Sequence, residues 1–110
     1  MTEKLLGKIR SAKLGFGGYQ DAMFGLSLDF DLNGSGIGTF ISGGWTGERS
    51  EYARWTEEDR SKLQSELIVK LMKILKAAKV DDVIKLKNIP VEVIIENQSL
   101  KDWRILTEVL

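Results

Sequence analysis

Hydrophobic and polar residues alternate without a break over residues 24–32. Every second residue in this range is leucine or phenylalanine, and glycine, serine or aspartate stands between them. Because successive side chains of a β-strand point to opposite faces, the pattern predicts a strand with one buried and one solvated side. The turn sequence 33–36 (Asn-Gly-Ser-Gly) predicts a hairpin into a strand at 37–42. Shorter alternation predicts an earlier strand at 8–16, so the N-terminal part should form an antiparallel meander.

The pattern changes to helical spacing after residue 55. Thr56 with Asp59 three residues later forms a capping-box sequence, and acidic residues fill the predicted first turn. Large apolar residues then recur every three or four positions, which predicts one broad face that packs on the sheet. These residues are Leu63, Leu67, Leu71, Ile74, Leu75 and Ala78.

The C-terminal part returns to strand-like patterns. We expect Asp81 to cap a short turn through Leu86, before Pro90 stops it. Residues 91–96 and 103–109 alternate as two further strands around a turn at 97–99. The whole order predicts one α+β domain, residues 1–110, in which an antiparallel β-sheet of three N-terminal and two C-terminal strands packs against one long α-helix plus a short helix.

Charge and composition narrow the function classes. Lys+Arg and Asp+Glu both number 16, so the formal net charge is zero. A zero balance argues against strong nonspecific binding to nucleic acid or to an anionic membrane, and it favours self-association into a homo-oligomer. No apolar stretch predicts a leader or a membrane span, so we expect a cytoplasmic protein.

The chain contains neither histidine nor cysteine. Disulfides, thiolate chemistry and cysteine-ligated metals are therefore excluded, and the commonest general base is missing. The carboxylate pairs have strand-surface or helix-cap explanations. We therefore expect a protein that is not an enzyme and that has no catalytic residue, no metal site and no cofactor.

Two motifs are better explained by structure than by binding. Residues 29–34 match the first half of a calcium loop, but Phe40 stands where the twelfth position requires a glutamate. Four lysines, spaced by three, follow in the helix. At that spacing they drift around the axis by roughly 60° each, so we interpret them as a solvated series that complements the helix dipole. These are Lys70, Lys73, Lys76 and Lys79.

A glycine-rich loop and a set of aromatic and arginine residues form the candidate binding site. All eleven glycines lie in the first 47 residues, and glycine permits the positive φ angles that shape a loop. Arginine beside aromatic rings suits a ligand with a flat ring and an anionic group, such as a nucleotide. The predicted ligand-binding residues are Phe16, Gly17, Gly18, Tyr19, Gln20, Asp21, Trp45, Arg49 and Arg104.

Four phrases spread along the chain resemble a family of small phage and prophage proteins. They are GFGGYQDAMFGLSLDF (15–30), FISGGW (40–45), WTEEDR (55–60) and LKDWRILTEVL (100–110). The resemblance implies a phage origin and assigns neither an activity nor a site. Small phage accessory proteins of this size are often inhibitors of bacterial immunity. The strand–helix–strand order is also similar to that of sponge proteins, which oligomerise and bury cyclic nucleotide or cyclic ADP-ribose signals between subunits.

These lines lead to one main expectation for function. The chain is expected to be a non-enzymatic phage anti-defence protein that sequesters a nucleotide-type immune signal in the cytoplasm of the bacterial host. One alternative is a protein–protein inhibitor of a host defence protein, such as a CRISPR nuclease. A second alternative is a phage accessory or structural protein.

Overall fold

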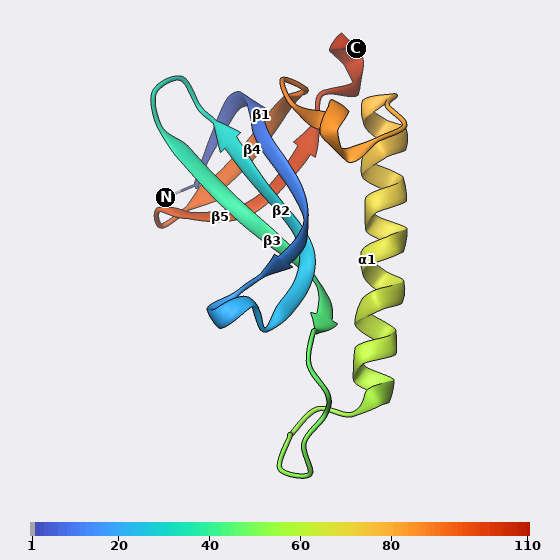
Figure 1. Cartoon of the computed structure of the whole chain (residues 1–110). Helices are drawn as coiled ribbons and strands as arrows, with labels where there is room; N and C mark the ends of the chain where they lie inside the picture. The colour runs from blue at the N-terminus through green and yellow to red at the C-terminus, as the bar shows by residue number, and fades with distance from the viewer. Residues whose placement is uncertain (1) are drawn as a thin grey trace.

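The computed structural model describes residues 2–110 as an antiparallel sheet with one long helix (Figure 1). The sheet order is β3-β2-β1-β4-β5, and the helix α1 spans Glu57–Ala78. The predicted α+β fold is confirmed. The strands are β1 Thr2–Gly17, β2 Met23–Asp31, β3 Gly36–Trp45, β4 Pro90–Glu96 and β5 Ser99–Ile105. The short 3-10 turns are η1 Tyr19–Asp21, η2 Val83–Leu86 and η3 Thr107–Val109.

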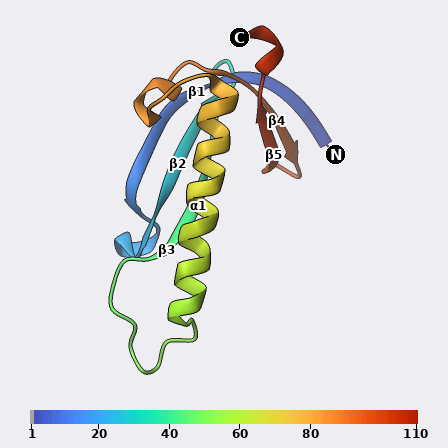
Figure 2. The same cartoon turned by 90° about the vertical axis from the view of Figure 1, so that its right-hand side faces the viewer.

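The central strand β1 organises the sheet. Its first half pairs with β4, and its second half pairs with β2. The register shifts between Ile9 and Ser11, and such a bulge bends a strand and increases its twist. The sheet therefore curls around α1 and brings the edge strands β3 and β5 near each other (Figure 2). The prediction of a strand at 8–16 missed the segment that pairs with β4.

The core lies between the concave face of the sheet and α1. The predicted alternation of β2 is confirmed, because Leu26, Leu28 and Phe30 are buried. From the helix, Leu67 is buried, and Leu71 is among the partly buried residues that pack against the core. The ten buried hydrophobic residues are Ile9, Leu26, Leu28, Phe30, Leu67, Ala78, Leu86, Val91, Val93 and Ile105.

Local hydrogen bonds fix where the helical segments begin. Asp59 N donates to Thr56 Oγ1 at 3.0 Å, and Thr56 N donates to Asp59 Oδ2 at 2.8 Å, as the capping box predicts. The expectation that Asp81 caps the next turn is wrong. Asp82 occupies the extended position just before η2 and accepts a 3.0 Å hydrogen bond from Ile84 N. Asp81 stands one residue too early for this role.

The last strand also differs from the prediction of residues 103–109. Asn97 and Gln98 have positive φ angles of 52° and 67°, which gives a two-residue hairpin turn between Glu96 and Ser99. β5 therefore begins at Ser99 and ends at Ile105, near the start of its partner β4, and η3 follows. None of the helices formed by residues 2–110 is long and apolar enough to cross a membrane.

Candidate ligand-binding site

The glycine-rich loop has an unusual and well-anchored backbone. Gly18 has a φ angle of 75°, and Gln20 and Asp21 both have φ angles of 55°. Residues other than glycine rarely adopt this region of positive φ. Thr46 Oγ1 donates a 3.0 Å hydrogen bond to the Asp21 carbonyl and ties the loop to the end of β3. The loop presents Tyr19 to solvent with 85% of its surface exposed.

Two glycines around this loop have a packing role. Gly17 and Gly25 lie beneath the ring of Phe40 on the convex face of the sheet. A Cβ at Gly17 would stand 2.8 Å from Phe40 Cε1, and a Cβ at Gly25 would overlap the Ile41 carbonyl oxygen. Phe16 points to the opposite, concave face, where its ring meets Phe24 edge-on at 6.2 Å. Part of the glycine pattern thus makes room for an aromatic ring of the chain itself.

The predicted residues Trp45 and Arg49 belong to a structural cluster. Trp45 stacks on Trp55 with ring centroids 4.3 Å apart, and the guanidinium of Arg60 lies 4.4 Å from the Trp55 ring centroid. Arg49 donates through Nε to the Trp55 carbonyl. Arg60 Nη2 donates to the Gly47 carbonyl at 2.6 Å. These contacts hold the loop between β3 and α1 against the start of the helix.

Arg104 lies at the other end of the molecule and is already paired. Its guanidinium donates to Glu108 Oε1 at 3.1 Å and to Glu92 Oε1 at 3.2 Å. These hydrogen bonds, first that to Glu108 and then that to Glu92, raise the pKa of Arg104 above its ordinary value. The structure therefore places Trp45 opposite Met23, just after the 16–21 loop. Arg49 belongs to the segment between β3 and α1, and Arg104 lies on β5, at the opposite edge of the sheet order from β3 (Figure 1).

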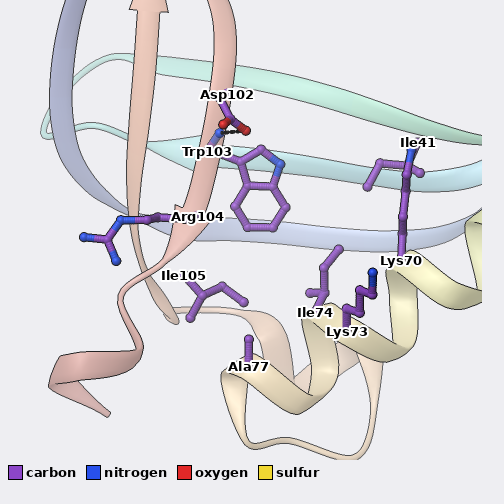
Figure 3. Close-up of a pocket in the computed structure, with 9 residues that line it drawn as sticks. All are labelled: Ile41, Lys70, Lys73, Ile74, Ala77, Asp102, Trp103, Arg104 and Ile105. Carbon is purple, nitrogen blue, oxygen red and sulfur yellow. Dashed lines mark hydrogen bonds between the residues drawn. The ribbon is translucent and has the colours of Figure 1, made fainter.

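A cleft forms where α1 passes the edge strands β3 and β5 (Figure 3). Its volume is about 420 Å³, which lies within the usual range for small-molecule sites. The curl of the sheet creates it, because β3 and β5 approach each other without pairing. The lining residues are Ile41, Lys70, Lys73, Ile74, Ala77, Asp102, Trp103, Arg104 and Ile105.

The walls of the cleft are mainly apolar, and two lysine side chains, Lys70 and Lys73, lie on its helix side. The indole of Trp103 points into the space between β5 and α1, whereas the Arg104 guanidinium points away from it (Figure 3). Trp103 also packs on Phe30 at 5.1 Å between ring centroids, which fixes its position. Within residues 2–110, Lys70 and Lys73 form no ion pair, and the Trp103 indole N–H donates no hydrogen bond.

This arrangement suits a ligand that combines a flat or apolar body with an anionic group. The indole offers a ring face, and the two ammonium groups offer unpaired positive charge. Asp102 also lines the cleft, and its Oδ1 accepts a 2.8 Å hydrogen bond from the Trp103 backbone N–H. Among the described residues, no group of three or more carboxylates is placed to hold a metal ion.

The sequence pattern does not single out Lys70 and Lys73 as candidate site residues. Their spacing of three was consistent with a solvated series, because such positions drift around a helix. The pattern that indicates this flank is the spacing of the two lysines relative to Ile74 and Ala77. It places two lysines, one aliphatic side chain and one small residue on the same side of the helix.

Comparison of the chain with protein-family models, curated proteins and solved structures finds no match.

Proposed function

We propose that this protein is a non-enzymatic binding protein that sequesters a nucleotide-type signal in the cleft between α1 and β5. In the phage context suggested by the sequence phrases, capture of such a signal in the host cytoplasm would weaken an immune response. The observation that carries the proposal is the cleft itself, in which Trp103 stands opposite two unpaired lysines, Lys70 and Lys73.

The energies of these contacts favour an anionic ligand with a ring. A phosphate about 4 Å from one ammonium group gains roughly 4 kcal/mol near a protein surface, before desolvation is subtracted. Stacking of a base on an aromatic side chain adds about 1–3 kcal/mol. A micromolar complex requires about 8 kcal/mol of net binding free energy. Lost translational freedom and desolvation consume several kcal/mol of the gross gain, so an affinity of this size requires both ammonium groups, the indole and burial of the apolar part of the ligand together.

The volume of the cleft favours a compact ligand. Sites for small molecules span roughly 300–1,000 Å³, and about 420 Å³ lies toward the lower end of that range. The cleft is formed by α1, β3 and β5 of one chain, so capture requires no second subunit. A cyclic ADP-ribose isomer or a cyclic dinucleotide fits these features better than a cyclic trinucleotide does.

A thermal-shift screen tests the proposal. The panel contains cyclic ADP-ribose isomers, cyclic dinucleotides and cyclic trinucleotides. A bound member should stabilise the protein by about 4 kcal/mol when its concentration is about 1,000 times the Kd. Absence of a shift for every member, together with co-purification of a host protein, would contradict sequestration and support a protein–protein inhibitor.

Matched variants locate the site. Lys70→Gln/Lys73→Gln should remove the ligand-induced shift, because it removes the unpaired charge from the cleft. Lys62→Gln/Lys76→Gln changes the net charge equally, at helix positions outside the cleft, and should keep the shift. Equal shifts in the two double variants would show that the ligand binds elsewhere.

A further inference from the structure

The flank of α1 that faces away from the cleft adjoins an exposed apolar surface. We call the residues Leu14, Phe16, Phe24, Ile68 and Met72 the apolar face. Each of them keeps between 38% and 60% of its surface exposed, although all five are large hydrophobic residues. Single exposed hydrophobic residues are normal, but several that gather on one side of a molecule can form an interaction surface.

Strand and helix geometry bring these residues to one side of the molecule. Phe16 and Phe24 are cross-strand partners whose rings touch, and Leu14 lies two residues from Phe16 on the same side of β1. Ile68 and Met72 are four residues apart, so they share one flank of α1. Figure 2 shows α1 running between β5 and the second half of β1. The cleft occupies the flank toward β5, so Ile68 and Met72 occupy the flank toward β1.

This flank carries no charge over about three helical turns. Its solvent-accessible side consists of uncharged residues, whereas the flank toward the cleft carries lysines and a glutamate. The uncharged residues are Ser61, Gln64, Ser65, Ile68 and Met72. The charged residues of the other flank are Lys62, Glu66, Lys70 and Lys73. In a twofold dimer the same patch meets itself, so a charged patch repels its own copy and an uncharged one does not.

The size of the apolar face matches what a dimer requires. A whole aromatic side chain presents roughly 150–250 Å². With the observed exposed fractions, the five side chains together offer roughly 450 Å² of apolar surface. A standard interface buries about 800 Å² per partner, of which about 57–65% is apolar. The apolar face thus offers about as much apolar surface as one partner buries in such an interface.

We propose that the apolar face is the contact surface of a homodimer, in which it packs against the same face of a second copy of this chain. The zero net charge removes long-range repulsion between the two copies. The cleft lies on the other flank of α1, so it stays open in the dimer. The proposal therefore does not depend on the proposed ligand.

Sedimentation velocity from about 1 to 100 μM, the range in which a micromolar dimer forms, tests this proposal. The native chain should sediment with twice its mass of 12.4 kDa. Phe16→Glu and Met72→Glu each place two like charges across the twofold axis. Each should raise the dimer dissociation constant by about 100-fold or more, so that at about 10 μM the variant is mostly a 12.4 kDa monomer while the native chain is mostly a dimer.

Ile84→Glu is the matched control. Ile84 is an exposed hydrophobic residue of η2 and lies outside the apolar face, so this variant should remain a dimer. Circular dichroism must show that all variants are folded, and Met72→Glu keeps the test decisive if Phe16→Glu unfolds. A native chain that stays monomeric at about 100 μM would overturn the proposal. Equal dimerisation of Met72→Glu and Ile84→Glu would overturn it too.

Discussion

Replacement of Gly25 by alanine tests how closely the sheet packs beneath Phe40. Gly25 lies within β2, where it pairs with Gly15 of β1 and Ser42 of β3. An added Cβ would lie 2.7 Å from Phe40 Cζ and would overlap the carbonyl oxygen of Ile41. The ring can rotate away, but the carbonyl belongs to the backbone of β3. The methyl group therefore forces the paired strands β2 and β3 apart.

The size of this effect follows from the immobility of the carbonyl. Overpacking usually costs about 1–3 kcal/mol, and a clash with paired backbone belongs at the upper end, so we expect a loss of about 3 kcal/mol. For a domain of this size, that loss lowers the Tm by about 12 °C or more. Urea denaturation gives the free energy of unfolding, and calorimetry gives the Tm.

Gly47→Ala is the control for the same chemical change. No atom lies within 4 Å of the position of a Cβ at Gly47. The variant should therefore stay within about 0.5 kcal/mol of the native chain or become slightly more stable. If Gly25→Ala also changes the free energy of unfolding by less than about 0.5 kcal/mol, the close approach of the Ile41 carbonyl to Gly25 is refuted.

Two further predictions concern local hydrogen bonds. Thr56→Ala should lower the free energy of unfolding, measured by urea denaturation, by about 1 kcal/mol, because Asp59 N loses its acceptor. Thr56→Ser keeps a hydroxyl acceptor and should therefore retain most of this stability. The hydrogen bond from Lys85, and then its charge, lower the pKa of Asp81 below the ordinary 3.8. The Asp81–Lys85 ion pair therefore stabilises the folded protein above about pH 4, and this contribution disappears as the pH falls through the lowered pKa of Asp81. Lys85→Gln should raise that pKa in a carboxyl NMR titration, and an unchanged pKa would contradict the pairing.

The fold was predictable where the signal is local. The alternation of β2 continues for its whole length, and the capping box at Thr56 marks the first turn of α1. The first half of β1 was missed because Gly7 and the bulge after Ile9 interrupt its alternation. The end of β5 was misplaced because pairing stops near the start of β4, and alternation alone does not reveal where a partner strand begins.

The candidate site was less predictable because it depends on tertiary geometry. The cleft forms between α1 and β5, which are far apart in the sequence, and it exists because the bent β1 curls the sheet. The position of Trp103 opposite Lys70 and Lys73 follows from that curl, and no local pattern in the sequence indicates it. A role for the 16–21 loop in binding stays a prediction, although its backbone has the expected positive φ angles.

The most direct test of ligand capture in the cleft follows the indole N–H signals by NMR. The chain has three tryptophans, and Trp103→Phe assigns the signal of the one that lines the cleft. During titration with cyclic ADP-ribose and with cyclic di-adenosine monophosphate, the Trp103 signal should move with saturable dependence on ligand. The signals of Trp45 and Trp55, which stack on each other outside the cleft, should stay in place. Saturable movement of these two signals with a stationary Trp103 signal, or no movement of any of the three, would contradict binding in the cleft.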